Sequence, residues 1–194
     1  MKKAVFLDRD GTVNKETGYL HKPDDFSFLP GVVEAIRIFR ELGYMVIVVT
    51  NQSGVAHGYY EEEDVKRLHD HMDGLLALEG TSVDAYYYCP HHPEGARDDY
   101  RKICGCRKPA PGMIQQAAKV FDLDLARSIC IGDKTIDAQA GMNAGVGRCA
   151  LVKGIYPVDE TIARSVPLFG NLLEFALHLK SVEQELNAQM ASTD

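Results

Sequence analysis

Short apolar runs alternate along the chain with segments in which apolar residues recur every three or four positions. The runs predict buried strands at 4–7, 44–49, 84–88, 128–132 and 148–152. The segments with helical spacing predict helices at 32–42, 61–79, 112–121, a short one ending at 144, and a final one at about 171–187. Alternating strands and helices predict an α/β fold, with one parallel sheet between two layers of helices.

The segments between these elements indicate how the chain is organised. Residues 14–29 show no period and contain Gly18 and Pro23, so we expect a loop or small hairpin over the carboxyl end of the first strand, placed to contact a substrate. Residues 153–169 are expected to be a loop. No repeat, linker or large insertion interrupts the pattern, which predicts a single domain over residues 1–194 without a large cap domain.

Polar side chains follow three of the predicted strands. They are Asp8 and Asp10 after the first, Thr50, Asn51, Gln52 and Ser53 after the second, and Asp133, Lys134 and Asp137 after the fourth. The carboxyl ends of parallel strands form one edge, where open α/β sheets bind ligands. A few carboxylates suit Mg²⁺, and nearby cations such as Arg107 and Lys108 suit a phosphoryl group. The alternative is that Asp8 and Asp10 only cap a turn.

A polar loop between Cys89 and Arg107 carries four residues with the spacing of metal ligands. Cys89 and His91 form one pair, and Cys104 and Cys106 form the other. Two such pairs predict a closed tetrahedral zinc site with a structural role, in which His92 is an alternative to His91. Free thiols or a Cys104–Cys106 redox pair are the competing interpretations. The other two cysteines lie in apolar runs and are expected to be buried thiols.

Composition excludes several classes of function. A formal net charge of −7 over 194 residues argues against nucleic acid as a partner, and no run approaches the length of ~20 apolar residues of a membrane span. Five cysteines, an odd number, argue against a disulfide framework. We therefore expect a cytoplasmic protein. His69 and His71 are expected on the solvent side or rim of their helix rather than as metal ligands.

The strand-end motifs are similar to those of the haloacid dehalogenase superfamily. Asp-Arg-Asp-Gly-Thr, Val-Thr-Asn-Gln-Ser, a lysine before a helix and Gly-Asp-Lys occur in that order. Longer stretches, including Gly-Tyr-Leu-His, Cys-Pro-His-His-Pro and Cys-Arg-Lys-Pro-Ala-Pro-Gly-Met, resemble the D-glycero-D-manno-heptose 1,7-bisphosphate 7-phosphatase family over about residues 4–152. The resemblance implies a Rossmann-like core and a Mg²⁺-dependent phosphatase. Histidinol-phosphate phosphatase and a non-catalytic zinc-containing binding module are the alternatives.

The resemblance also implies individual roles. Asp8 would be the nucleophile that forms an aspartyl-phosphate, Asp10 the general acid and base, and Thr50 and Lys108 the groups that stabilise the phosphoryl. Mg²⁺ would be bound by Asp8, the backbone carbonyl of Asp10, and Asp133, and Zn²⁺ by Cys89, His91, Cys104 and Cys106. The expected substrate contacts are Arg9, Glu16, Thr17, Gly18, Tyr19, Asn51, Gln52, Ser53, Arg107 and Lys134.

Three further expectations complete this assignment. Asp137 would support the site by orienting Lys134 or a metal-bound water. Lys134 has the alternative of being an ordinary solvent-exposed lysine in the first turn of its helix. The expected partner is a small phosphorylated sugar bound by a monomer.

Overall fold

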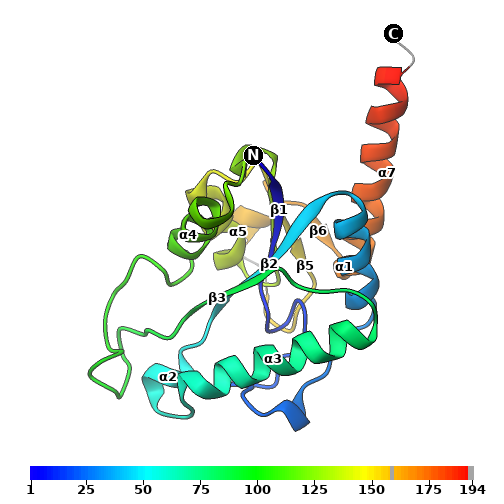
Figure 1. Ribbon diagram of the computed structural model, residues 1–194. Helices are drawn as coiled ribbons and strands as arrows, with labels where there is room; N and C mark the ends of the chain where they lie inside the picture. The colour runs from blue at the N-terminus through cyan, green and yellow to red at the C-terminus, as the bar shows by residue number, and fades with distance from the viewer. Residues whose placement is uncertain (158–159, 192–194) are drawn as a thin grey trace.

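The computed structural model describes residues 1–157 and 160–191 and contains a central sheet with helices on both faces (Figure 1). The strands are β1 (Lys3–Leu7), β2 (Tyr44–Asn51), β3 (Ala85–Cys89), β4 (Ile129–Gly132), β5 (Arg148–Val152) and β6 (Leu168–Phe169). The α-helices are α1 (Val32–Glu41), α2 (Gly54–His57), α3 (Glu62–Leu78), α4 (Gly112–Phe121), α5 (Thr135–Ala144), α6 (Glu160–Ala163) and α7 (Leu172–Ala191). Two short 3₁₀ helices are η1 (Pro23–Asp25) and η2 (Leu125–Arg127).

All the strand pairs of this sheet are parallel, in the order β3-β2-β1-β4-β5-β6. This confirms the predicted parallel α/β sheet. The central position of β1 follows from its sequence, because it is apolar on both faces, which is typical of a strand covered by helices on either side.

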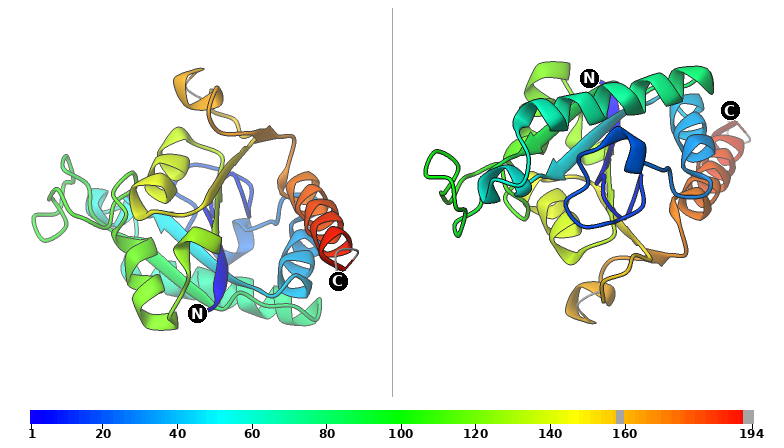
Figure 2. Two further views of the ribbon diagram at one scale, coloured as in Figure 1. Left: turned by 90° about the horizontal axis from the view of Figure 1, so that it is seen from above. Right: turned by 90° about the horizontal axis from the view of Figure 1, so that it is seen from below.

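Side chains of β1 alternate between the two helical layers. Val5 and Leu7 join the core built with α1, α3 and α7, whereas Ala4 and Phe6 join the core built with α4 and α5. This period of two is the geometry of an extended strand. The two cores lie on opposite faces of the sheet, so the predicted three layers are confirmed, and Figure 2 shows the helices around the sheet from above and below.

The prediction of residues 153–169 as loop is wrong in part, with residues 158–159 outside the described residues. The segment contains α6. Its last two residues, Leu168 and Phe169, form β6, which pairs with β5 at two positions. A strand of two residues is too short to show an alternating hydrophobic pattern in the sequence, and only its pairing with β5 identifies it. The short helix α2 was not predicted either.

Residues 14–29 form a loop, as predicted. The loop includes η1, and an antiparallel bridge between Asn14 and Phe28 joins its two ends. At the far side, α7 packs along α1 (Figure 1). Across residues 1–157 and 160–191, no helix has the length and apolar character that crossing a membrane requires.

Candidate active site and metal clusters

A cleft of about 300 Å³ opens at the carboxyl ends of β1, β2 and β4. Most of the predicted site residues line it. The segment after β1 contributes Asp8, Asp10, Glu16, Gly18 and Tyr19, and the end of β2 and its turn contribute Thr50, Asn51, Gln52 and Ser53. The other predicted residues in the cleft are Arg107, Lys108, Lys134 and Asp137. The strand ends therefore converge as the parallel sheet requires.

Lys108 lies at the floor of this cleft and is almost fully buried. Its Nζ lies 2.6 Å from Asp8 Oδ1 and 2.6 Å from Asp137 Oδ1, and it also donates to the carbonyl of Val49 at 2.9 Å. Burial alone would lower the pKa of this ammonium group, but the two carboxylates raise it above its usual value. Lys108 is therefore a fixed positive charge beside Asp8.

Asn51 holds the backbone of Lys108 in place. Its side-chain amide donates to the Lys108 carbonyl at 3.1 Å and its Oδ1 accepts from the Lys108 amide at 3.0 Å. Asn51 is expected to contact the substrate, and in the structure its side chain also connects the end of β2 with the segment before α4.

Asp8 is surrounded by charges of both signs. Burial raises its pKa to about 7, with Asp137 acting in the same direction and Lys108 in the opposite one. A cation near the free side of this carboxylate would favour its ionised form.

Asp133 is a buried carboxylate below the cleft. Neither of its oxygens has a hydrogen-bond partner within the described part of the chain, and burial raises its pKa to about 6. One oxygen each of Asp8, Asp133 and Asp137 lie within 4.8 Å of one another. Unpaired buried carboxylates are costly, and a set of oxygen ligands fits a hard divalent cation such as Mg²⁺.

Two glycines make room for Asp133. A Cβ on Gly11 or Gly154 would overlap its carboxylate. Gly11 also has a φ of +90°, a conformation that favours glycine. Backbone from two loops therefore closes around the carboxylate.

Asp137 contacts both lysines of the site. Its Oδ2 accepts from the backbone amide of Lys134 at 2.9 Å and so caps the start of α5, which agrees with the expected contact with Lys134, while Oδ1 pairs with Lys108. The ammonium group of Lys134 instead pairs with Glu16 at 3.1 Å. Lys134 is thus positioned across the cleft by Glu16.

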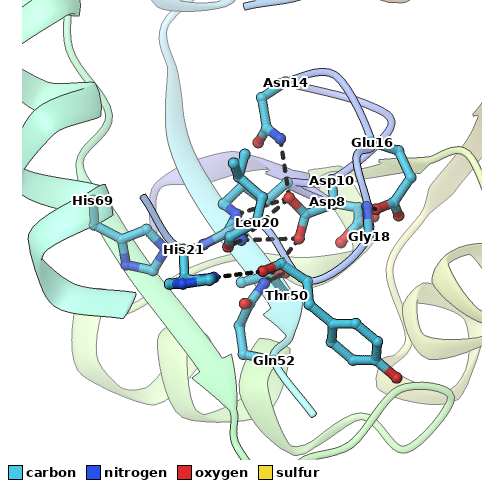
Figure 3. Close-up of polar contacts among 12 residues, drawn as sticks. Asp8, Asp10, Asn14, Glu16, Gly18, Leu20, His21, Thr50, Gln52 and His69 are labelled. Carbon is cyan, nitrogen blue, oxygen red and sulfur yellow. Dashed lines mark hydrogen bonds and ion pairs between the residues drawn. The ribbon is translucent and has the colours of Figure 1, made fainter. Parts of the chain in front are cut away.

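Asp10 is held by three side chains, and Figure 3 shows two of them, Asn14 and Gln52, beside its carboxylate. Asn14 and Gln52 donate to it at 2.9 Å each, and Arg9 pairs with it at 3.0 Å. Burial alone would raise the pKa of Asp10, but the Arg9 charge and these hydrogen bonds outweigh it and leave the pKa below its usual value.

The structure places Arg9 away from the cleft, and this does not support its expected contact with substrate. Its side chain is 0% exposed. The guanidinium contacts Asp10, the Leu20 carbonyl at 3.2 Å and His69 Nε2 at 3.3 Å. Thr17 also lies outside the main cleft, in a neighbouring depression.

The expectation that His69 lies on the solvent side is wrong. It is 5% exposed, and its ring stacks on Tyr86 with centroids 4.3 Å apart. Burial and the Arg9 charge lower its pKa to about 3. Arginine can only donate, so Nε2 of the neutral ring accepts the hydrogen bond.

Sequence reasoning missed three residues of the cleft, namely Tyr60, Ile136 and Tyr156. The Tyr60 hydroxyl donates to Gln52 Oε1 at 2.7 Å and so orients the amide that contacts Asp10. Gly54 makes this possible, because a Cβ there would overlap the Tyr60 ring. A glycine directly after the polar residues of β2 was the one feature of the sequence that pointed to a side chain packed at this position. Tyr156 lies against Lys134, whose Nζ is 4.8 Å from the ring centroid.

The predicted zinc ligands form a second cluster beside the cleft. The sulfur atoms of Cys89, Cys104 and Cys106 lie 3.2–3.5 Å apart, and His91 Nδ1 lies 3.4 Å from Cys106 and 3.6 Å from Cys89. Tetrahedral bonds of about 2.3 Å from sulfur to zinc would separate two sulfurs by ~3.8 Å, so the donor set fits Zn²⁺. His92 lies outside the cluster and packs on His57. The cluster touches the active site through Arg107, which donates to the His91 carbonyl at 3.3 Å.

The fold and this site together define a hydrolase of the haloacid dehalogenase type, and the HAD-hydrolase-like family profile matches residues 105–172. A Photorhabdus laumondii protein named D-glycero-beta-D-manno-heptose-1,7-bisphosphate 7-phosphatase is 45% identical over 170 residues, which are 88% of this chain and 90% of the relative. The chain belongs to the family of D-glycero-D-manno-heptose 1,7-bisphosphate 7-phosphatases.

Two other relatives agree with this assignment. A second P. laumondii protein, whose name specifies the alpha anomer of the same sugar, is 43% identical over 84% of this chain and 90% of its own length. The crystal structure of D,D-heptose 1,7-bisphosphate phosphatase from B. bronchiseptica, complexed with magnesium and phosphate, superposes with a TM-score of 0.74. It is 33% identical and covers 91% of this chain and 97% of its own.

Proposed function

We propose that this protein is a Mg²⁺-dependent phosphatase that removes the 7-phosphate of D-glycero-D-manno-heptose 1,7-bisphosphate through an aspartyl-phosphate on Asp8. The observation that carries the proposal is the floor of the cleft, where Asp8 lies 2.6 Å from buried Lys108 and next to the unpaired carboxylate of Asp133. The names of the relatives supply the sugar. Acting in sugar biosynthesis, the protein would be a cytoplasmic monomer of one domain.

The residues divide the reaction between them. A carboxylate oxygen of Asp8 attacks phosphorus, and Lys108 and Thr50 compensate the charge that develops on the phosphoryl oxygens. Asp8, Asp133 and the backbone carbonyl of Asp10 would hold Mg²⁺, which when bound offsets the repulsion between the phosphoryl group and its nucleophile. Lys108 also keeps Asp8 oriented through its contact with Asp137.

Asp10 would move the protons. With its pKa below the usual value in the free protein, the carboxylate is ready to take a proton from the water that hydrolyses the aspartyl-phosphate. For the first step it must carry a proton to the departing sugar oxygen. A phosphoryl dianion in the cleft adds negative charge beside Asp10, which raises its pKa and favours the protonated form.

The remaining cleft residues would bind the rest of the sugar. Arg107 and Lys134 supply positive charge for the second phosphate, and Glu16 and Tyr156 fix the Lys134 side chain. The backbone around Gly18 and Tyr19 borders the opening. The zinc cluster would hold Arg107 in place through the His91 carbonyl. With no cap domain to enclose the cleft, specificity would depend on these loops.

A kinetic comparison tests the proposal. Turnover of the alpha and beta anomers of the heptose bisphosphate and of histidinol phosphate is measured with Mg²⁺ present. We expect at least one heptose anomer to be hydrolysed about 100-fold more efficiently than histidinol phosphate, since the second phosphate adds ion pairs worth on the order of 3 kcal/mol. Faster hydrolysis of histidinol phosphate would overturn the assignment of the substrate.

A second experiment tests the nucleophile. Asp8→Asn should reduce kcat at least about 1000-fold with zinc content unchanged, and the wild-type enzyme quenched during turnover should carry a hydroxylamine-sensitive phosphate. Asp70→Asn is the matched control, because Asp70 is an exposed aspartate of α3. Activity of Asp8→Asn near that of the control would show that Asp8 is not the nucleophile.

A further inference from the structure

A second cavity, which we call the amino-end cavity, lies at the opposite end of the sheet from the active site. It has a volume of about 360 Å³ and is lined by Lys3, Tyr44, Ala126, Arg127, Arg148, Glu183 and Leu186. Lys3, Tyr44 and Arg148 are the first residues of β1, β2 and β5. Glu183 and Leu186 come from the C-terminal half of α7.

Among the described residues that line this cavity, Glu183 is the only acidic one, and its charge is already compensated. The carboxylate of Glu183 accepts from the Tyr44 hydroxyl at 2.6 Å and pairs with Lys3 Nζ at 3.2 Å. The Lys3 ammonium group also lies 3.9 Å from the centroid of the Tyr44 ring. Burial and Glu183 raise the pKa of Tyr44 above its usual value, so its hydroxyl stays protonated and neutral.

Two arginines remain without a counterion. Arg127 ends η2 and Arg148 begins β5, and the Arg148 amide donates to the Ser128 carbonyl at 3.3 Å, which keeps the two segments adjacent. No ion pair joins either guanidinium to a carboxylate of residues 1–157 and 160–191. Glu183 pairs with Lys3 instead, and both arginines are exposed. Both lie close enough to Tyr44 for their charges to oppose the rise in its pKa. Two unpaired cations at one cavity contrast with the net charge of −7.

The space next to Arg148 is mostly apolar. Arg148 also lines an adjoining cavity of about 450 Å³, whose walls include Phe169, Phe175, Leu179 and Val182. Leu179, Val182, Glu183 and Leu186 recur at helical spacing on one face of α7. That face therefore borders a charged cavity and an apolar one side by side.

We propose that the amino-end cavity binds the phosphate group of a small organic phosphate, with Arg127 and Arg148 as its charged partners and the apolar body of the ligand in the adjoining cavity. Two guanidinium groups match the two negative charges of a phosphate monoester and offer it paired N–H donors. A carboxylate carries one negative charge and would leave one arginine uncompensated. Such a site lies apart from the cleft where the reaction takes place.

Two non-hydrolysable probes test this proposal. Methylphosphonate presents the charged group alone, and phenylphosphonate adds an apolar ring, while the carbon–phosphorus bond of both resists a phosphatase. Each is titrated into ¹⁵N-labelled full-length protein, and amide shifts are followed by residue. We expect shifts around Arg127 and Arg148 with both probes, at least five-fold tighter for phenylphosphonate. Shifts confined to the active-site cleft would overturn the proposal. Equal affinities for the two probes would overturn the part of it that places the apolar body of the ligand in the adjoining cavity.

Matched variants distinguish specific binding by the two arginines from a non-specific effect of the protein's net charge. Arg127→Gln with Arg148→Gln should weaken phenylphosphonate binding at the amino-end cavity at least ten-fold, with kcat/KM for the heptose bisphosphate within two-fold of wild type. Lys66→Gln with Lys119→Gln removes the same charge from exposed positions elsewhere and should leave that binding unchanged. Equal weakening in both double variants would overturn the assignment of the two arginines.

Discussion

His69 makes the stability of this protein depend on pH in a window that can be calculated. The ring is neutral and buried in the folded state, where burial and Arg9 lower its pKa to about 3. In the unfolded chain its pKa returns to about 6.5. Between these two values the unfolded state binds a proton that the folded state does not, so stability falls as the pH is lowered from 6.5 towards 3.

The size of the effect follows from the difference in bound protons. Lowering the pH from 7 to 5 protonates almost all of the unfolded His69 and almost none of the folded His69, which costs about 2 kcal/mol of unfolding free energy. The loss is large relative to the 5–15 kcal/mol that is usual for a domain. Other groups titrate over the same range, so the contribution of His69 has to be isolated by a variant.

His69→Gln isolates it, because the glutamine Oε1 offers Arg9 an acceptor and does not titrate. Urea unfolding of both proteins is measured at pH 7, 6 and 5, with zinc content checked at each pH. The stability difference in favour of the wild type should shrink by about 2 kcal/mol between pH 7 and pH 5. A difference that stays constant within about 0.5 kcal/mol would refute a neutral, buried His69.

Three other predictions concern the metal sites and Lys108. Lys108→Met leaves the carboxylates of Asp8 and Asp137 buried without their partner, so it should lose about 3 kcal/mol of stability in urea unfolding at pH 7 besides activity; unchanged stability would contradict the ion pairs. Cys104→Ser should lose zinc and lower both Tm and activity, whereas Cys149→Ser should keep its zinc; a zinc-free Cys104→Ser protein as stable as the wild type would contradict a structural metal. Gly154→Ala pushes a Cβ into Asp133 and should raise the Mg²⁺ concentration for half-maximal activity about ten-fold, while Gly74→Ala, which has open space, should not; equal Mg²⁺ dependence would contradict Asp133 as a ligand.

The local pattern was sufficient to predict most of the fold. Short apolar runs that alternate with helical segments predicted a sheet between two layers of helices, and the polar residues after the strands placed Asp8, Thr50 and Asp133 at one edge. These predictions succeed because each depends on only a few consecutive residues. β6 escaped prediction, because its two residues are a strand only by pairing with β5.

Contacts between distant segments account for the errors in the site. His69 follows a polar stretch of α3 and looks solvent-facing, but its partner Arg9 lies 60 positions earlier in the chain. Arg9 was assigned to the substrate on the family resemblance. Neither residue reveals in its own neighbourhood that the two side chains meet under the loop at Leu20. The motif identified the charged groups but not which of them face the cleft.

The shared ammonium group of Lys108 has a consequence for how the two ligands of the active site bind. The carboxyl groups of Asp8 and Asp137 both pair with this one lysine, and that of Asp133 lies within 4.8 Å of them, so three carboxyl groups gather at the floor of the cleft around a single paired ammonium group. A phosphorylated sugar arriving first would be repelled, and a divalent cation arriving first would not. Affinity for each should therefore increase when the other is bound, by the same factor in both directions, and the Mg²⁺ concentration would set how well the enzyme retains its substrate.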